Sequence, residues 1–244
     1  MRTIITIPTY NEAENIARLI RTIRSLGPEY EVLVADDDSP DGTWHIVQEV
    51  ARTDPGVHLL HRTQNKGRGS AGSHAFQVAM EMGADRIGEM DADFSHDPRH
   101  LPALVKALDD ADVVLGSRAV PGGGESGRPF SRRLITRLAN LYIRTVLWLP
   151  VRDCNSGYRM FRRRVFEAIP PLSLRAKGPD IVQELLFKCH KKGFRIVEIP
   201  IHFVERAQGM SKLDLKRLYR GYTVVLHLRF LSMTGKLFEG GHSQ

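Results

Sequence analysis

Two groups of carboxylates are the residues whose types and spacing most clearly suggest chemistry. An acidic run at residues 36–38 follows the apolar segment 31–35, and the pair Asp91 and Asp93 follows residues 86–90. If both apolar segments are parallel strands of one sheet, both groups emerge at the same edge and can converge on one crevice. On extended backbone, side chains two residues apart point the same way. Two adjacent carboxylates are hard oxygen ligands that Mg²⁺ or Mn²⁺ accepts while it also binds a diphosphate.

The sequence therefore predicts a divalent-metal site at Asp91 and Asp93. A metal ion there would neutralise negative charge as a nucleoside diphosphate leaves. The competing interpretation is that short acidic runs form solvated loops or helix caps. It is weakened here because both groups follow apolar segments of the same apparent sheet.

Residues 67–72 form a GxGxxG motif between a predicted strand and a predicted helix, with Asp91 about 20 residues further on. This arrangement resembles the fingerprint of a dinucleotide-binding fold, so a nicotinamide-dependent oxidoreductase is an alternative. Two features argue against it. The motif follows the third strand instead of the first, and residues 62–66 separate it from that strand. We therefore expect a glycine-rich loop that brings Lys66 and Arg68 near a diphosphate.

Alternating apolar and amphipathic segments in the first 120 residues predict the elements that must position these side chains. Short buried strands are expected at residues 4–8, 31–35, 57–61, 86–90 and 113–116. Helices are expected at residues 12–25, 43–51, 70–82 and 98–108. Such alternation implies βαβ units, a mostly parallel sheet, and ligands at the carboxyl ends of the strands. The predicted fold class is α/β.

The alternation stops after residue 120. Residues 121–127 contain too many glycines for a regular element and are expected to form a flexible connection. Beyond them we expect helices at residues 131–149, 181–192 and 213–237 and a strand at residues 194–203. The simplest division is one domain at residues 1–212, followed by a C-terminal helical extension at residues 213–244.

Charge is distributed unevenly along the 244 residues. Residues 1–120 contain 12 Lys or Arg and 19 Asp or Glu, whereas residues 121–244 contain 23 and 9. An acidic first half and a basic second half suit the binding of a cation and of an anionic partner, respectively. A nucleic-acid-binding protein would also explain the basic half. It would need a basic recognition element with aromatic platforms, which is not evident, so we expect no nucleic-acid partner.

Amphipathic segments in the basic half suggest contact with a membrane surface. Residues 131–149 and 213–237 combine Lys and Arg with apolar side chains, which is typical of helices in a membrane interface. Alternatively, these helices pack on the sheet or on a second subunit. The sequence begins without the apolar core of a signal peptide, and Cys154 and Cys189 suggest free thiols in a reducing compartment. With no run of roughly 18 apolar residues, we expect a cytoplasmic protein that is peripheral at the cytoplasmic face of a membrane.

Six motifs in a fixed order carry a resemblance to a known family. They are residues 8–12 (PTYNE), 36–43 (DDDSPDGT), 90–96 (MDADFSH), 116–118 (GSR), 153–159 (DCNSGYR) and 206–212 (RAQGMSK). Any one motif is weak, but the ordered set is specific. On these residues the chain resembles the inverting family-2 glycosyltransferases, and among them the dolichyl- or polyprenyl-phosphate mannose synthases.

The resemblance implies a GT-A fold, which is a Rossmann-like α/β domain that binds a nucleotide sugar. The residues expected to line the nucleotide-sugar site are Pro8, Tyr10, Glu12, Asp36, Asp38, Lys66 and Asp91. The metal, Mn²⁺ or Mg²⁺, is expected at Asp91 and Asp93. The residues expected at the acceptor phosphate are Arg118, Arg132, Arg206 and Lys212. The expected catalytic set is Asp91, Asp93, Arg118, Arg206 and Lys212. Some family members have a third metal ligand at the position of Ser95, and a serine is a weaker ligand there.

The chemistry of the acceptor fits this expectation. Inverting transfer is an in-line displacement at the anomeric carbon, and a hydroxyl acceptor normally needs a carboxylate base. A phosphate monoester has its second pKa near 6, so it is already largely a dianion near neutrality. It needs cationic groups that position it more than it needs a base. If the acceptor is instead a hydroxyl, Asp153 is the candidate base.

The resemblance implies GDP-mannose as the donor and a polyprenyl (dolichyl-type) phosphate as the acceptor, which would give a lipid-linked monophosphosugar. The residues themselves leave open a donor of the UDP-glucose type, a hydroxyl acceptor, the prenyl chain length and the oligomeric state. Many relatives append transmembrane helices. We therefore also consider a membrane-spanning partner protein.

Overall fold

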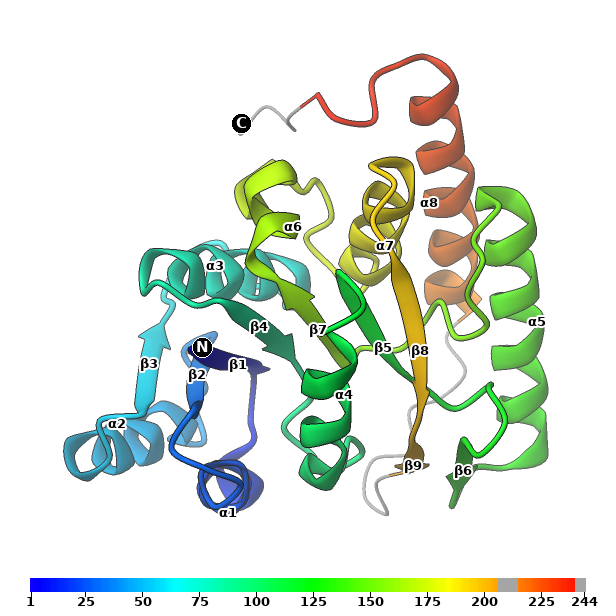
Figure 1. Ribbon diagram of the computed structural model, residues 1–244. Coiled ribbons are helices and arrows are strands. Elements are labelled where there is room, and N and C mark those ends of the chain that lie inside the picture. Colours follow the sequence, from blue (N-terminus) through cyan, green and yellow to red (C-terminus); the bar gives the residue numbers. More distant parts are fainter. Residues whose placement is uncertain (206–214, 240–244) are drawn as a thin grey trace.

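Seven strands form the central sheet, in the order β3-β2-β1-β4-β7-β5-β8 (Figure 1). The computed structural model describes residues 1–205 and 215–239. The strands of this sheet are β1 (Thr3–Thr9), β2 (Tyr30–Asp36), β3 (Val57–His61), β4 (Arg86–Glu89), β5 (Val113–Ser117), β7 (Arg159–Arg162) and β8 (Ile196–Pro200). All neighbouring pairs are parallel except those that β7 makes with β4 and β5. The prediction of an α/β fold with a mostly parallel sheet is confirmed.

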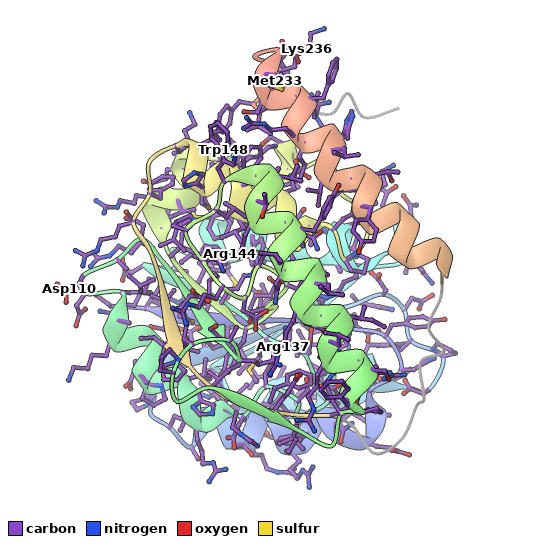
Figure 2. All side chains as sticks on the ribbon, turned by 90° about the vertical axis from the view of Figure 1, so that its right-hand side faces the viewer. Asp110, Arg137, Arg144, Trp148, Met233 and Lys236 are labelled. Carbon is purple, nitrogen blue, oxygen red and sulfur yellow. The ribbon has the colours of Figure 1, made fainter. Side chains whose placement is uncertain are left out.

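Helices cover both faces of the sheet (Figure 1). One face carries α1 (Ala13–Arg24), α2 (Thr43–Thr53) and α4 (Leu101–Ala107), the last preceded by a 3₁₀ turn at Pro98–His100. The other face carries α3 (Arg68–Glu81), α6 (Arg163–Ala168) and α7 (Ile181–Lys191), with a second 3₁₀ turn at Pro171–Ser173. Two longer helices, α5 (Phe130–Leu147) and α8 (Leu215–Met233), lie side by side at the edge of the molecule (Figure 2).

The pattern of apolar residues explains the first half of the fold. All seven residues of β1 are buried, with Ile4 in the core of one face and Ile5 and Ile7 in the core of the other. A strand covered on both faces reads as a continuous apolar run, as observed here. In α1 the buried side chains recur at helical spacing and face the sheet. The carboxyl ends of β1, β2 and β4 therefore meet at one edge.

The second half differs from the sequence prediction at three places. Strand β7 lies between β4 and β5 and was not predicted, because its sequence RMFR is short and flanked by arginines, although Arg159 is buried. Helix α6, which follows it directly, was not predicted either. The predicted strand at residues 194–203 is interrupted at Ile201 and contributes to two sheets, as β8 and as β9 (His202–Val204).

The prediction that residues 121–127 contain no regular element is wrong. Strand β6 (Gly124–Ser126) pairs in parallel with β9 in a separate two-stranded sheet. The glycine before it, Gly123, is needed for close packing, since a Cβ there would lie 2.5 Å from the carbonyl oxygen of Ser117. The glycines therefore permit a close approach of two backbone segments and are not evidence of a flexible connection.

Helices α5 and α8 contact each other through aromatic side chains. The Tyr142 hydroxyl donates to the Tyr222 carbonyl oxygen at 3.2 Å, and the two rings meet edge to face. The Arg229 guanidinium lies 4.4 Å above the Trp148 ring. In the described part of the chain, no helix is both long and apolar enough to span a bilayer.

Candidate active site at the carboxyl edge of the sheet

The acidic run after β2 is held in place by its own loop. Asp36 is fully buried and accepts hydrogen bonds from the Thr9 hydroxyl at 2.8 Å and from the Ser39 amide and hydroxyl at 2.8 and 2.7 Å. Asp36 thereby fixes the loop against the end of β1. These bonds indicate that Asp36 supports the loop from within the protein.

Asp37 connects this loop to the glycine-rich segment. It is ion-paired with Arg62, and its second oxygen accepts from the Gly67 amide at 2.6 Å. Burial raises the pKa of Asp37, while the Gly67 amide and Arg62 act in the opposite direction. The ionised form is therefore costly to keep in this position and depends on both partners.

Asp38 differs from its two neighbours because it faces solvent. Its backbone is left-handed, with φ of 56°, and its carboxylate accepts from Lys66 Nζ at 2.9 Å and lies 3.0 Å from His61 Nε2. The hydrogen bond from Lys66 is the main reason that the pKa of Asp38 lies below its ordinary value, and His61 adds to it. Trp44 stacks on His61 at 4.2 Å between ring centroids. These four side chains form an open, polar surface with an aromatic face.

Residues 8–12 lie beside this surface because β1 and β2 are parallel neighbours in register. Pro8 pairs with Ala35 at the end of the strands and is buried, whereas the Tyr10 side chain is 58% exposed. The Glu12 amide donates to the Thr43 hydroxyl at 2.9 Å, which ties the start of α1 to the start of α2. The structure therefore brings Pro8, Tyr10 and Glu12 close to the acidic loop, as expected for a common site.

Asp91 follows β4 and lies in a concave site between cationic and aromatic groups. Arg68 donates to Glu89 at 2.6 Å and to Asp91 at 3.2 Å. His96 is buried, and its Nδ1 accepts from the Asp91 amide at 3.1 Å. Burial is the main reason that the pKa of His96 lies below its ordinary value, and Asp91 acts in the opposite direction. The concave surroundings disfavour charge on Asp91, but His96 and Arg68 outweigh this effect, and its pKa lies below the ordinary value.

Asp93 and its neighbours show which kind of metal site this edge can form. One oxygen of Asp93 accepts from the Ser95 amide at 3.0 Å, and Phe94 between them is left-handed with φ of 60°. Within the described residues, no group of three or more His, Cys, Asp or Glu side chains could hold a metal ion. A metal ion at the predicted ligands Asp91 and Asp93 would therefore have to take its remaining ligands from other groups, such as a bound diphosphate and water.

The glycine-rich segment has a structural explanation that removes the dinucleotide alternative. The Gly69 and Ser70 amides at the start of α3 donate to the Lys177 carbonyl oxygen at 3.0 and 3.4 Å. A Cβ on Gly69 would lie 2.5 Å from the carbonyl oxygens of Ala176 and Gly178. Residues 176–178 therefore occupy the helix N-terminus where a pyrophosphate would bind in a dinucleotide fold.

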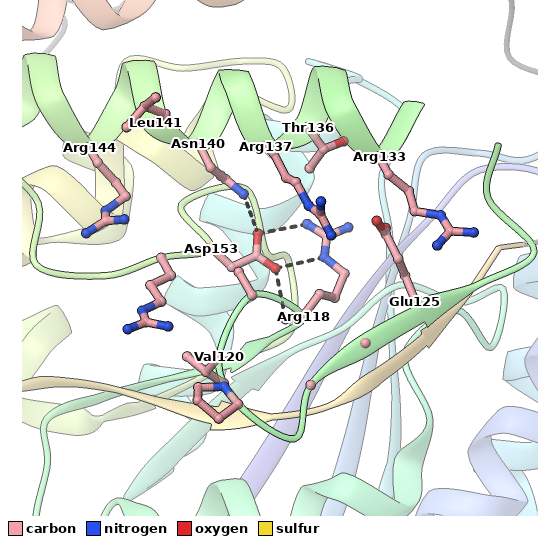
Figure 3. Close-up of a pocket in the computed structure, with 15 residues that line it drawn as sticks. Arg118, Val120, Glu125, Arg133, Thr136, Arg137, Asn140, Leu141, Arg144 and Asp153 are labelled. Atoms are coloured by element: carbon pink, nitrogen blue, oxygen red, sulfur yellow. Dashed lines mark hydrogen bonds and ion pairs between the residues drawn. The ribbon is translucent and has the colours of Figure 1, made fainter. Parts of the chain in front are cut away.

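Arg118 follows β5 and is held by Asp153. The two side chains form a bidentate pair, with Nε to Oδ2 at 2.7 Å and a terminal nitrogen to Oδ1 at 2.8 Å. The Arg118 amide also donates to Asp153 at 3.1 Å, and Asn140 of α5 donates at 3.3 Å (Figure 3). Burial opposes ionisation of Asp153, but Arg118 outweighs it, and the pKa of this carboxyl lies below its ordinary value. Both oxygens are thus occupied and only weakly basic.

A cavity of about 780 Å³ opens beside this pair, between α5 and residues 118–125 (Figure 3). Four further arginines line it, and we call them the arginine cluster: Arg133, Arg137, Arg144 and Arg152. Among the residues that the structure describes, none of the four has an acidic side chain within ion-pair distance. Arg144 Nε is in addition buried without a hydrogen-bond partner in the described chain. The cavity is therefore suited to an anion.

Arg132 lies outside the wall of this cavity. It pairs with Glu205 at 2.5 Å, and Glu205 is also 3.9 Å from Arg128. Arg206 and Lys212, expected at the acceptor phosphate, lie outside the described residues. Of the four expected acceptor groups, the structure thus describes Arg118 at the cavity and Arg132 near it.

Three amide side chains near this edge were not singled out from the sequence. They are Asn140, Asn155 and Gln183, which form a hydrogen-bonded chain that ends at Asp153. Isolated Asn and Gln residues give no pattern in a sequence, so only the DCNSGYR motif, which contains Asn155, hinted at one of them.

Comparison with known proteins identifies relatives of the chain in sequence and in fold. Residues 4–169 match the family model described as Glycosyl transferase family 2. The chain is 44% identical over 214 residues to an undecaprenyl-phosphate mannosyltransferase of Micrococcus luteus, covering 88% of each chain. It is 40% identical over 215 residues to a polyprenol monophosphomannose synthase of Mycolicibacterium smegmatis, covering 87% of this chain and 81% of the relative. The solved structure of mannosyl-3-phosphoglycerate synthase from Rubrobacter xylanophilus shares the fold, with a TM-score of 0.69 over 100% of this chain and 78% of its own, at 20% identity.

Proposed function

The chain belongs to glycosyl transferase family 2, and from this premise we propose that it transfers a mannosyl group from GDP-mannose to a polyprenyl phosphate. The product is a polyprenyl monophosphate that carries mannose. The names of the relatives at 44% and 40% identity support the mannosyl group and the polyprenyl phosphate. Among the structural observations, the main support is Arg118, a cation fixed at the carboxyl edge of the sheet beside an arginine-lined cavity.

The donor is proposed to bind across the ends of β1, β2 and β4. Tyr10, Asp38 and Lys66 are the exposed groups that would contact the nucleotide. Asp91 and Asp93 would hold Mn²⁺ or Mg²⁺ against the diphosphate, and the ion would neutralise charge on the leaving nucleotide. Arg68, which already contacts Asp91 at 3.2 Å, adds positive charge at the same place.

The acceptor phosphate is proposed to bind at Arg118, with Arg132, Arg206 and Lys212 completing the site. A phosphate oxygen would attack the anomeric carbon in line with the leaving diphosphate. A C–O bond to the acceptor forms as the C–O bond to the diphosphate breaks, so the anomeric configuration inverts. The dianion needs no proton removed. The contribution of the protein is to position the two anions and to limit their repulsion.

The state of Asp153 argues against a hydroxyl acceptor. A general base must be free to accept a proton and should have a pKa near the working pH. Both oxygens of Asp153 are instead held by Arg118 and Asn140, and its pKa is lowered. Asp153 is therefore proposed to position Arg118, and a phosphate acceptor, which needs no base, fits the site better.

A membrane surface is proposed as the place where the acceptor is met. Apolar side chains on α5 recur at helical spacing and are exposed, namely Phe130, Leu134, Leu138 and Leu141, and Trp148 directly after the helix is exposed as well. On the neighbouring α8 the exposed apolar side chains are Leu226, Phe230 and Met233. Apolar stripes on two adjacent helices, flanked by arginines, are typical of helices that lie in a lipid interface.

The test is a transfer assay with purified protein, radiolabelled GDP-mannose, Mn²⁺ and a polyprenyl phosphate in detergent, in which label is counted in the organic phase. We expect labelled lipid with wild-type protein, and loss of it with EDTA or in Asp91→Asn. Asp110→Asn, an equivalent change at an exposed position, serves as the control and should retain activity. Parallel reactions with UDP-glucose test the alternative donor.

Two outcomes would contradict the proposal. Transfer from UDP-glucose but not from GDP-mannose would overturn the donor. Label that appears only when a hydroxyl acceptor is supplied, and that disappears in Asp153→Asn with the fold retained, would overturn the acceptor.

A further inference from the structure

The cavity beside Arg118 is larger than one phosphate group requires. Its volume of about 780 Å³ lies in the range of about 300–1,000 Å³ that is usual for whole ligands. Among the described residues, five arginines and two carboxylates line it, which leaves an excess of three positive charges. A phosphate monoester, as proposed for the acceptor, is largely a dianion near neutrality and neutralises two of them. The wall of the cavity can therefore accommodate a second anion.

The acids at this cavity are already engaged with other partners. Asp153 is in an ion pair, and Glu125 pairs with Arg128 at 2.9 Å. Glu198 accepts from the backbone amides of Arg152 and Asp153 at 2.7 and 3.0 Å, so both of its oxygens are used. None of these three carboxylates is thus available to neutralise the arginine cluster.

Helix α5 spreads the arginine cluster along the cavity. Arg137, Asn140 and Arg144 recur at helical spacing and line its wall. Arg137 and Arg144 are seven residues apart, which corresponds to about 10 Å along the helix axis. Asn140 lies between them and donates to Asp153. In Figure 3 this hydrogen-bonded pair separates Arg144 from Arg137 and Arg118. The cavity therefore offers cations in two places.

Arg144 and Arg152 belong to the part of the cavity that is remote from Arg118, which we call the distal part. They come from different elements, the last turn of α5 and the loop that follows it, and both line the cavity. Neither has an ion-pair partner within residues 1–205 and 215–239. The helix dipole favours a cation in the last turn of α5. It does not explain why a second arginine lines the same concave wall, whereas a bound anion does.

Leu141 indicates which kind of anion fits the distal part. It lines the cavity on α5 between Arg137 and Arg144, and its side chain is nevertheless 57% exposed. It also belongs to the exposed apolar side chains of this helix. An occupant would therefore meet guanidinium groups and apolar surface together. Guanidinium groups bind phosphate oxygens through paired hydrogen bonds, and acyl chains bind apolar surface. An anionic phospholipid combines both features.

We propose that Arg144 and Arg152 bind the phosphodiester head group of an anionic phospholipid, at a site separate from that of the acceptor phosphate. The bound lipid holds α5 against the membrane and leaves Arg118 accessible to the acceptor. Only the distinction between the two sites rests on the proposed function.

The experiment measures binding of dihexanoyl-phosphatidylglycerol by calorimetry, below its micelle concentration, to wild type and to Arg144→Gln/Arg152→Gln. Arg21→Gln/Arg52→Gln removes the same charge from exposed positions on α1 and α2 and is the matched control. Two further ligands separate the parts of the lipid. Glycerophosphoglycerol is the same head group without acyl chains, and dihexanoyl-phosphatidylcholine has the same chains without net charge. Thermal unfolding of each variant verifies the fold.

We expect the phosphatidylglycerol to bind wild type and the control equally, and Arg144→Gln/Arg152→Gln about 30-fold more weakly, as for two arginines at a charged lipid. Each of the two partial ligands should bind wild type at least about tenfold more weakly, because it lacks either the apolar contact or the charge. Saturating geranyl phosphate, a short acceptor analogue, should not displace the phosphatidylglycerol. The KM for this analogue in the transfer assay should stay unchanged in Arg144→Gln/Arg152→Gln.

Displacement of the phosphatidylglycerol by geranyl phosphate, or a rise in KM that parallels the loss of lipid binding, would show one acceptor site and overturn the proposal. Equal loss in the control variant would overturn it as well, since only net charge would matter. Glycerophosphoglycerol that binds as tightly as the lipid would assign the site to a free phosphate ester. Protein that binds the lipid as expected but transfers no mannose would instead overturn the proposed function.

Discussion

The acidic edge of the sheet and the arginine cluster of the large cavity carry opposite charges. They also differ in whether their charged side chains have partners within the protein. At the acidic edge each carboxylate already has partners: Asp36 has Thr9 and Ser39, and Asp91 has Arg68. The arginine cluster has no acidic partner among the described residues. The carboxylates of the first region are thus largely paired within the protein, whereas the arginines of the second are available to bind an incoming anion.

The difference indicates what each region does. Groups that are fixed before a ligand arrives stabilise charge without having to reorganise, which favours chemistry at that place. Unpaired cations near a surface with exposed apolar side chains favour recruitment of an anionic, lipid-bearing partner. Arg118 belongs to both regions, because it lines the cavity and is held rigidly by Asp153.

The largest effect should come from replacing Arg118 and so removing its ion pair with Asp153. Arg118→Met leaves Asp153, whose side chain is 1% exposed, as an uncompensated buried charge. We expect a loss of about 3–5 kcal/mol in the free energy of unfolding and a loss of transfer activity of at least about 100-fold. Urea unfolding and the transfer assay measure the two.

Arg137→Met removes an arginine of the cluster as a matched control, and its stability should change by less than about 0.5 kcal/mol. Equal destabilisation by the two changes would refute the contrast between the regions.

The tight packing of the acidic edge predicts a second effect. A Cβ on Gly69 would lie 2.5 Å from two backbone carbonyl oxygens, so Gly69→Ala should lower the free energy of unfolding by about 1–3 kcal/mol. In α8, a Cβ on Gly221 would meet no atom of the described residues within 4 Å, and Gly221→Ala should raise stability by about 0.5–1 kcal/mol. Thermal unfolding measures both, and changes of the same sign would contradict this prediction.

The arginine cluster should contribute to binding of anionic vesicles. The double variant Arg137→Gln/Arg144→Gln should bind phosphatidylglycerol vesicles about 30-fold more weakly in co-sedimentation, at about 1 kcal/mol per arginine near the surface. Affinity for GDP should not change. Arg21→Gln/Arg52→Gln makes the same change of charge on the opposite half and should retain vesicle binding. A similar loss in both would show that only net charge matters.

The smallest effect concerns pH. The pKa of Asp153 is lowered in the folded protein, because Arg118 outweighs the effect of burial. Its stabilisation is therefore present above the unfolded-state pKa of about 3.9 and is lost as the pH falls through the folded-state value. Below about pH 4, the free energy of unfolding of wild type should fall more steeply than that of Asp153→Asn, measured by urea unfolding from pH 7 to 3. Parallel curves would show that Asp153 does not depend on Arg118 for its charge.

The parallel part of the fold could be predicted from the sequence because the patterns that indicate its strands and helices are local. Apolar runs such as β1 and the helical spacing in α1 can be recognised within a dozen residues. The carboxylates that follow β2 and β4 lie at the same edge because both strands run parallel to β1. The same local reading failed for β7, because a short segment with terminal arginines is recognised as a central strand only when its neighbours on both sides are known.

The candidate site divides in the same way. Residue types and motif order indicated Asp91, Asp93 and Arg118 and the expected chemistry of a nucleotide-sugar transferase. They also led to Asp153 as a candidate base, but the structure shows both of its oxygens engaged. Whether a carboxylate is free or held depends on which group the fold places beside it.

By itself, the sequence determined the α/β class, the carboxylates at the strand ends and the ordered motifs of the family. Each of these features depends on residues that are close together in the chain. Only the tertiary structure decided which charges are paired, that residues 176–178 cover the glycine-rich segment, and that three amides link Gln183 to Asp153. These contacts join residues far apart in the chain. Their energies depend on burial and on hydrogen-bond direction, and neither exists until the chain is folded.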